Sequence, residues 1–335
     1  MSSEIDADRL HAFLSPALGG LAGRPQIERI GGGQSNPTYF VSYDDRRLVL
    51  RKQPPGELLP SAHAVDREYR VISALASTTV PVPRALVYCD NRAVLGTPFY
   101  VMERLEGRVF HDCTLPGVPA DQRRQMYVSM ADTLAALHAV DPAAVGLGDF
   151  GRAGNYFARQ VARWTRQWQM SRTREDTAID RLITWLPANL PDDDRSGISH
   201  GDYRIGNLMF HASQPRVIAI LDWELSTLGH PLADLAHSCM AWQTAPEEYG
   251  GLAGLPLVEL GLLSQVDYEA RYYAAAPIGT VRLAPFHMAF ALFRWSVIFE
   301  GIAARAKAGN ATSENAAEVG RLSGVFAQRA AALIK

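Results

Sequence analysis

The stretch Ile198-Ser199-His200-Gly201-Asp202-Tyr203-Arg204-Ile205-Gly206-Asn207, followed by Val217-Ile218-Ala219-Ile220-Leu221-Asp222, decides the expected fold. In it, three oxygen-bearing side chains lie beside short apolar runs: Asp202 after Ser199, Asn207 before residues 208–210, and Asp222 after residues 217–221. Runs of four or five apolar residues are typical of buried strands. We therefore expect the three polar side chains to lie at strand ends and to point into one cleft.

These three side chains suit phosphoryl transfer. A carboxylate can take a proton from a hydroxyl group, and a second carboxylate with an amide oxygen can hold Mg²⁺, a hard cation that prefers oxygen. The spacing Asp202-x-x-x-x-Asn207 matches the kinase catalytic loop, with Gly201 in place of its arginine. Turn chemistry alone also places Asp and Asn at strand ends. The second Asp after a strand, together with the N-terminal signals below, favours the kinase interpretation.

Several motifs in combination resemble the aminoglycoside phosphotransferase-like family of small-molecule kinases. They are His200-Gly201-Asp202 with Asn207, Leu221-Asp222-Trp223-Glu224, and Gly-His-Pro-Leu-Ala-Asp-Leu-Ala at 229–236. Residues 51–68 and 221–231 are more similar still to one branch, the kinase-like segment fused to acyl-CoA dehydrogenase domains in proteins that degrade 4-hydroxy acids. The resemblance covers roughly residues 25–330.

The resemblance implies an α+β, protein-kinase-like fold with two lobes. We expect a small β-rich N-terminal lobe at residues 1–103, which binds nucleotide, and a larger, mostly helical lobe at 104–335, which binds the acceptor. The hinge is placed at about 103–107. The resemblance further implies that backbone groups of Glu103 and Leu105 hold adenine.

A glycine-rich stretch, Gly-Gly-Gly-Gln-Ser-Asn at 31–36, precedes a β-rich run. Glycines let backbone N–H groups approach phosphate oxygens. The pattern departs from G-x-G-x-x-G, so by itself it is better explained as a flexible turn. The resemblance implies that its members cover the ATP phosphates, namely Gly32, Gly33, Ser35 and Asn36.

The predicted strand at 48–52 ends in two cations. Strand side chains alternate between faces, so Arg51 shares a face with Val49 and Lys52 lies on the other. Register against the kinase strand Val-Ala-Ile-Lys favours Arg51 as the cation that contacts phosphate, with Lys52 as the alternative. The planar fork of arginine suits phosphate oxygens. A solvent-facing pair of cations at a strand end would also explain these residues.

A helix is expected at 62–76, and Glu68 falls on its apolar stripe of Val65, Ile72 and Leu75. A buried acid requires a cationic partner, because unpaired burial is unfavourable. The kinase pattern pairs a strand cation with a helix glutamate. We therefore expect Glu68 to pair with Arg51; an exposed position for Glu68 is the alternative.

Two features of the second half allow rival interpretations. Residues 151–174 contain six arginines and no Asp or Glu. They predict a solvated basic face over an apolar stripe, or, as a sharper hypothesis, attraction of an anionic substrate by Arg159 and Arg163. His230, Asp234 and His237 have the spacing i, i+4, i+7 and could bind a transition metal in a metallohydrolase. The resemblance implies instead that Asp234 hydrogen-bonds the catalytic loop, which His200 also supports.

Composition excludes several classes. With 335 residues, 47% hydrophobic and 20% charged, and a net charge of −2, the chain lacks the basic surface of a nucleic-acid-binding protein. Its three scattered cysteines suggest neither a disulfide framework nor a zinc site. The acidic N-terminus and the absence of an uninterrupted apolar run of about 18 residues predict a cytoplasmic protein with no membrane partner.

We therefore expect a phosphotransferase that uses ATP and Mg²⁺ and acts on a hydroxylated small molecule. Asp202 would orient or deprotonate the hydroxyl group, Asn207 and Asp222 would bind Mg²⁺, and Arg51, braced by Glu68, would hold the phosphates. The resemblance implies a hydroxy acid or hydroxyacyl-CoA as acceptor. An antibiotic kinase is an alternative, although eight acids and eight bases balance after residue 239. The arginine in place of lysine also leaves a nucleotide-binding pseudokinase open. The sequence does not indicate the oligomeric state.

Overall fold

The computed structural model describes residues 5–31, 36–56, 64–309 and 315–334. Contacts divide the chain into two units, Met1–Gly107 with Ile218–Ser226, and Arg108–Val217 with Thr227–Lys335. The expected division had placed residues 218–226, which include Asp222, in the second lobe. Their contacts place them in the first unit.

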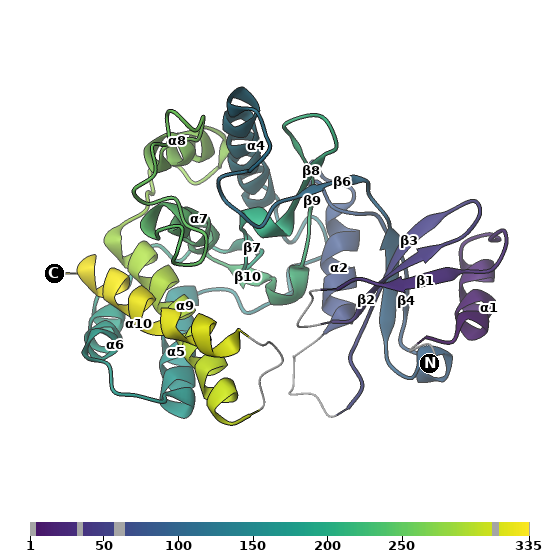
Figure 1. Cartoon of the computed structure of the whole chain (residues 1–335), viewed down its shortest axis with the longest axis horizontal. Helices are drawn as coiled ribbons and strands as arrows, with labels where there is room; N and C mark the ends of the chain where they lie inside the picture. The colour runs from purple at the N-terminus through teal and green to yellow at the C-terminus, as the bar shows by residue number, and fades with distance from the viewer. Residues whose placement is uncertain (1–4, 32–35, 57–63, 310–314, 335) are drawn as a thin grey trace. The chain divides into compact units, whose positions relative to one another are not determined.

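The first unit contains a five-stranded antiparallel sheet with the order β1-β2-β3-β5-β4 (Figure 1). Its strands are β1 (Gln26–Arg29), β2 (Thr38–Ser42), β3 (Arg47–Lys52), β4 (Ala85–Cys89) and β5 (Phe99–Glu103). Arg51 on β3 lies opposite Tyr100 on β5. This register sets which residues of the central strands share a face.

Helices cover both faces of this sheet. Leu10 and Leu14 of α1 (Ala7–Ala17) pack in one apolar cluster with Leu50 and other residues of the sheet. On the other face α2 (Val65–Leu75) contacts β4 and β5. Adjacent strand residues point to opposite faces, so Leu50 faces α1 while its neighbour Arg51 faces α2. A short helix, α3 (Arg92–Leu95), completes the helices described in this unit.

The second unit is mostly helical (Figure 1). Its helices are α4 (Ala120–His138), α5 (Tyr156–Ser171), α6 (Thr177–Ala188), α7 (Pro231–Cys239), α8 (Gln265–Ala275), α9 (Pro285–Lys307) and α10 (Ala316–Ala332). A two-stranded ribbon pairs β7 (Gly197–Ser199) with β10 (Thr227–Gly229). The remaining short strands of the chain are β6 (Gly107–Val109), β8 (Leu208–His211) and β9 (Val217–Ile220), of which β9 belongs mostly to the first unit. The expected strands beside Asp202, Asn207 and Asp222 are thus present.

Helix α9 is the one helix among the described residues that is long and apolar enough to cross a membrane. However, 78% of its apolar window is buried inside the protein, where α9 contacts α5, α7 and α10. A buried core helix passes the same test of length and composition. The sequence prediction expected a helical C-terminal third but considered only uninterrupted apolar runs, so it did not recognise that one helix there passes this test.

Candidate active site

The buried carboxylate of Asp234 holds the loop that carries Asp202 through hydrogen bonds to the loop backbone. Asp234, in the first turn of α7, accepts hydrogen bonds from the backbone N–H groups of His200 (2.6 Å) and Gly201 (2.9 Å). It also accepts from the Ser199 hydroxyl (2.9 Å). Burial would raise the pKa of Asp234, but His138 and these backbone donors outweigh it and lower the pKa to about 2. Asp234 therefore supports the loop in the way that the resemblance implied.

The backbone explains why glycine replaces the arginine of the kinase loop. Gly201 has φ +82°, in the left-handed region that other residues rarely adopt. The turn at Gly201 brings the N–H of Asp202 within 3.2 Å of His200 Nδ1, which accepts its hydrogen bond. His200 thus supports the loop as well, as expected.

Asp202 and Asn207 contact each other directly. Asn207 Nδ2 donates to Asp202 Oδ2 (2.7 Å) and to the Asp202 backbone oxygen (2.8 Å). Both residues lie on one short loop, because residues 205–207 form a 3₁₀ turn that bends the chain back before β8. With its nitrogen bound in this way, Asn207 presents its amide oxygen, which has no hydrogen-bond partner among the described residues.

Asp202 remains ionised despite being only 17% exposed. Burial would raise its pKa, but the interaction with His237, together with Arg204 and His200, holds the pKa well below its ordinary value. His237 Nε2 lies 2.9 Å from Asp202 Oδ1, and Arg204 Nε lies 3.5 Å from Oδ2. A charged, oriented carboxylate is what a base for a hydroxyl group requires.

In the first unit, three carboxylates converge on Arg51. Its Nε lies 3.1 Å from Glu68, and one terminal nitrogen lies 2.6 Å from Asp222 and 3.7 Å from Glu224. The expected pair of Arg51 and Glu68 is therefore present. The alternative cation, Lys52, is buried on the other face of β3, where its Nζ donates to the Leu95 carbonyl (3.0 Å).

Glu68 is buried at 1% exposure and has further partners. Its carboxylate accepts hydrogen bonds from Asn36 Nδ2 (2.6 Å) and the Tyr100 hydroxyl (3.1 Å). Burial raises the pKa of Glu68 to about 7, partly opposed by Arg51. The sequence did not predict the contact with Asn36. The other expected phosphate-loop residues, Gly32, Gly33 and Ser35, lie outside the described residues.

Asp222 is placed beside Arg51 by a strained turn. It has φ +62°, unusual for a residue other than glycine, and starts the 3₁₀ turn Trp223–Leu225. Trp223 anchors the turn by donating from Nε1 to Ile220, and Arg67 of α2 donates to the Ser226 carbonyl. Such backbone strain is unfavourable by about 1–3 kcal/mol and clusters at functional sites. The Asp222 side chain remains 35% exposed.

The expected adenine-binding residues lie at the end of β5. The Glu103 N–H donates to the Arg84 carbonyl (3.0 Å), and its carboxylate accepts from the Arg84 N–H (2.9 Å). The backbone groups of Leu105 make no hydrogen bond with another described residue. Leu105 therefore has groups available for a ligand, whereas the Glu103 N–H is already used.

The metallohydrolase interpretation is wrong. Helix α7 begins at Pro231, so His230 is its N-cap, and His230 Nδ1 accepts from the Leu232 N–H. His230 Nε2 faces Asp193 (3.4 Å), while Asp234 and His237 serve the catalytic loop. Among the described residues, no group of three or more His, Cys, Asp or Glu side chains could hold a metal.

The arginines of the basic segment largely contact their own surroundings. Arg174 pairs with Asp176 and Glu300, and Arg172 pairs with Glu175. Arg159 donates to the Arg152 carbonyl, and Arg163 lies over the Trp164 ring. The apolar stripe of α5 packs on α6 and α9 as expected. These contacts favour the solvated basic face.

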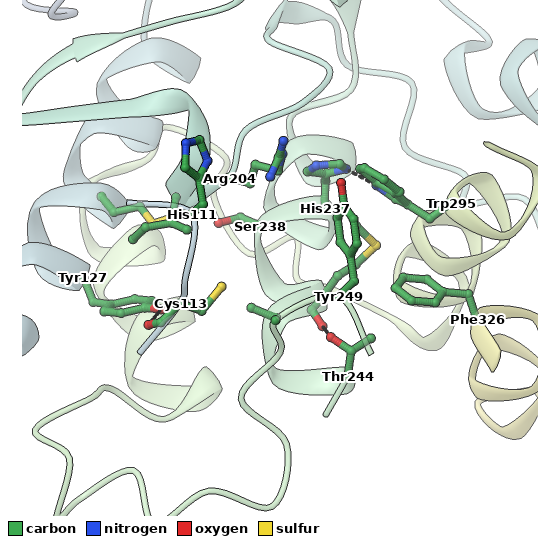
Figure 2. Close-up of a pocket in the computed structure, with 15 residues that line it drawn as sticks. His111, Cys113, Tyr127, Arg204, His237, Ser238, Thr244, Tyr249, Trp295 and Phe326 are labelled. Atoms are coloured by element: carbon green, nitrogen blue, oxygen red, sulfur yellow. Dashed lines mark hydrogen bonds between the residues drawn. The ribbon is translucent and has the colours of Figure 1, made fainter. Parts of the chain in front are cut away.

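A small pocket with an interior volume of about 60 Å³, partly open to solvent, lies next to Asp202 in the second unit (Figure 2). Arg204 and His237, which contact Asp202, both line it. In the view of Figure 2, His111, Arg204, His237 and Trp295 lie along one side and Cys113, Tyr127 and Thr244 along the other. Tyr249 and Trp295 belong to the aromatic residues of the C-terminal third that the sequence offers as a lining for an acceptor pocket. Sequence reasoning missed the other lining residues, because they come from distant segments. For His237 a signal was its spacing, since it follows Asp234 by nearly one helical turn.

Comparison with known proteins matches nearly the whole chain. A model of the phosphotransferase enzyme family matches residues 26–258. Acyl-CoA dehydrogenase family member 10 of Mus musculus is 41% identical over 330 residues, which are 97% of this chain and 31% of that protein. Acyl-CoA dehydrogenase family member 11 of Rattus norvegicus is 40% identical over 325 residues, 93% of this chain and 41% of that protein. The chain thus spans about a third to two fifths of the length of these relatives.

Solved structures share the fold. A chain from Ralstonia eutropha, provisionally assigned as an aminoglycoside phosphotransferase, has a TM-score of 0.90 and 40% identity, with 98% of each chain covered. Aminoglycoside phosphotransferase APH(4)-Ia, in a complex with AMP-PNP and hygromycin B, has a TM-score of 0.60 and 16% identity, with 96% of this chain and 99% of that chain covered. At that identity the second likeness shows the fold alone. The predicted α+β, kinase-like fold is confirmed.

Proposed function

Because this chain belongs to the phosphotransferase enzyme family, we propose that it transfers the γ-phosphoryl group of ATP, in the presence of Mg²⁺, to a hydroxyl group of a small molecule. The observation that carries this proposal is the intact catalytic loop. Asp202 is ionised, its Oδ2 is held by Asn207, and its backbone is fixed through Asp234. A loop that served only as a turn would not need a charged, oriented carboxylate.

In the proposed reaction Asp202 orients the acceptor hydroxyl group and takes its proton as the phosphoryl group moves. The protein forms no covalent bond to the phosphoryl group in this reaction, so most of the rate acceleration comes from positioning and charge neutralisation. Arg51 would contact phosphate oxygens with the guanidinium that Glu68 and Asp222 orient. Leu105 would contact adenine through its free backbone groups.

The residues proposed for Mg²⁺ suit that ion in their chemistry. Asn207 offers an amide oxygen whose nitrogen is already bound, and Asp222 offers a partly exposed carboxylate. Oxygen ligands of this kind are preferred by Mg²⁺, which neutralises charge on phosphate oxygens when bound. Arg51 now holds one oxygen of Asp222, so we expect that contact to weaken when the cation binds.

The acceptor that we propose is a hydroxy acid or its CoA thioester. The relatives of this chain carry acyl-CoA dehydrogenase in their names, which supports an acceptor of that chemistry. The pocket beside Asp202 has Arg204 and His111 in its lining and none of its lining residues is Asp or Glu. A polycationic antibiotic would need carboxylates, so this lining disfavours the aminoglycoside alternative.

Activity can be tested by measuring ADP release with MgATP and a panel of hydroxy acids, their CoA thioesters and aminoglycosides. We expect turnover with an anionic hydroxylated acceptor. Asp202→Asn should lower kcat on the order of a hundredfold to ten-thousandfold, as expected for loss of a base, with little effect on nucleotide binding. Asp132→Asn, which removes a surface ion pair with Arg271, is the matched control and should retain activity.

The pseudokinase alternative makes a different prediction in the same assay. Such a protein would bind nucleotide but show no ADP release above that of Asp202→Asn with any acceptor. Turnover by Asp202→Asn equal to that of the wild type would contradict the proposed role of Asp202.

A further inference from the structure

His237 and Asp202 form a buried pair that the proposed reaction does not require by itself. His237 lies on α7 with its side chain 2% exposed, and its Nε2 is 2.9 Å from Asp202 Oδ1. Both atoms are buried, and neither has a partner with well-aligned hydrogen-bond geometry among the described residues, so this 2.9 Å contact is the close polar contact that each makes. On the other side of the ring, His237 Nδ1 accepts a hydrogen bond from Trp295 Nε1 (3.2 Å), drawn as a dashed line in Figure 2.

The partner of Nδ1 decides where the ring carries its proton. An indole N–H can only donate, so Nδ1 must present its lone pair to Trp295. The proton of a neutral ring is then on Nε2, on the side of Asp202. Burial lowers the pKa of His237, and nearby Arg294 acts in the same direction, although Asp202 opposes them. The neutral ring therefore serves as a donor to the carboxylate.

Trp295 is itself held in place by its neighbours. Its ring packs against Tyr249 at 5.1 Å and against Phe299 at 5.2 Å between ring centres. Tyr249 also lines the pocket beside Asp202. The indole N–H is thus aimed at His237 by packing on a rigid core helix, α9.

We propose that His237 is a positioning residue for Asp202 and that Trp295 selects its donor tautomer. Resting on the proposed function, this assignment adds a second point of support to the base. Asn207 holds Oδ2 and His237 holds Oδ1, so the plane of the carboxylate is fixed from both sides. Because Oδ1 is buried, the acceptor would be met by Oδ2, which still has a second lone pair.

The tautomer can be measured without any activity. In protein labelled with ¹⁵N-histidine, ring nitrogen shifts distinguish an Nε2–H ring from an Nδ1–H ring, and His237→Gln assigns the signal. We expect the Nε2–H tautomer for His237 at pH 7.5 in the wild type. Trp295→Phe, which keeps an aromatic ring but removes the donor, should reduce that preference. An Nδ1–H ring or an imidazolium in the wild type would overturn the assignment.

The positioning role is tested by kinetics, with hydrolysis of MgATP as the probe and water in the place of the acceptor. His237→Leu should lower kcat on the order of tenfold to a hundredfold, because misplacing a reacting group by about 1 Å has effects of that size. KM for ATP should stay within about twofold. His237→Gln retains an N–H donor and should recover most of the loss, which a purely structural role would not produce.

A double-mutant comparison separates this inference from the proposed function. Trp295→Phe should lower kcat in the wild type but have no further effect in His237→Leu, because both changes act on one contact. Unchanged kcat in His237→Leu, or failure of His237→Gln to exceed it, would overturn the positioning role. If the wild type hydrolyses no ATP, the proposed function fails, whereas the tautomer measurement still decides the contact between Trp295 and His237.

Discussion

Arg51 is a single side chain whose geometry no lysine can reproduce. Its Nε contacts Glu68, while a terminal nitrogen contacts Asp222 and Glu224. The guanidinium fork reaches these carboxylates at once, whereas an ammonium group is a point charge at one position. Kinases usually have a lysine at this strand position. Here the three carboxylates around Arg51 suit the fork of an arginine.

Arg51→Lys should lower the free energy of unfolding by about 2 kcal/mol, the scale of a hydrogen bond to a charged group. The guanidinium is only 13% exposed, so solvent does not replace its contacts. Urea denaturation measures the change. Arg47→Lys, which alters an exposed pair with Glu106, is the control and should have almost no effect. Equal losses in the two variants would show that the contacts of Arg51 contribute no stability.

Residue-level prediction succeeded where periodicity was sufficient. Glu68 lies on the apolar stripe of a helix, and its neighbour on β3 follows from strand alternation, so the pair with Arg51 was predictable. The pair of His237 and Asp202 was not, because it depends on how α7 packs against a loop more than 30 residues earlier in the chain. The spacing of His230, Asp234 and His237 suggested instead a metal site on one face of a helix. His230 is the N-cap of α7 and therefore does not lie on that face.

At the scale of elements, α2 packs on the sheet and buries Glu68 between them. Burial raises the pKa of Glu68 from its ordinary 4.5 to about 7. A raised folded-state pKa means that the folded protein binds the proton more tightly than the unfolded chain does. The resulting stabilisation is complete below pH 4.5 and is lost as the pH rises through about 7.

Glu68→Gln has no proton to lose at this position. As the pH rises, the free energy of unfolding of the wild type should therefore fall relative to that of the variant. We expect the difference in unfolding free energy to shift on the order of 2 kcal/mol between pH 4.5 and pH 8, measured by urea denaturation. Glu106→Gln, at an exposed site, corrects for the general effect of removing a negative charge. A difference that is constant with pH, or that shifts in favour of the wild type, would contradict the prediction.

Elements were easier to predict than their boundaries. Helices α2 and α5 lie within the expected segments 62–76 and 151–174, and β3 starts one residue before the expected strand 48–52, because apolar periodicity and turn residues are local signals. The length and apolar composition of α9 were missed, because occasional polar residues interrupt its apolar pattern. No local signal shows that such a helix is buried among the four others that it contacts, α5, α6, α7 and α10.

At the scale of the whole molecule, nucleotide binding should stabilise the folded chain. A ligand at about 100 times its Kd adds roughly 2.7 kcal/mol, which thermal unfolding detects as a clear shift in Tm. We expect MgATP to produce such a shift, and ATP without Mg²⁺ to produce a smaller one. Asp222→Ala should lose the part that depends on Mg²⁺, whereas the surface variant Asp121→Ala on α4 should retain it. No shift with any nucleotide would contradict nucleotide binding.

The first unit is assembled from two separate stretches of chain, residues 1–107 and 218–226. During synthesis, the strand that carries Arg51 and the helix that carries Glu68 emerge long before Asp222, which follows 171 residues after Arg51. Until then, two of the three carboxylates that meet Arg51 do not yet exist. A fragment cut after Gly107 would likewise keep Glu68 but lack Asp222 and Glu224. The ion cluster can therefore be completed only when about half of the second unit has already been made, which couples completion of the first unit to synthesis of the second.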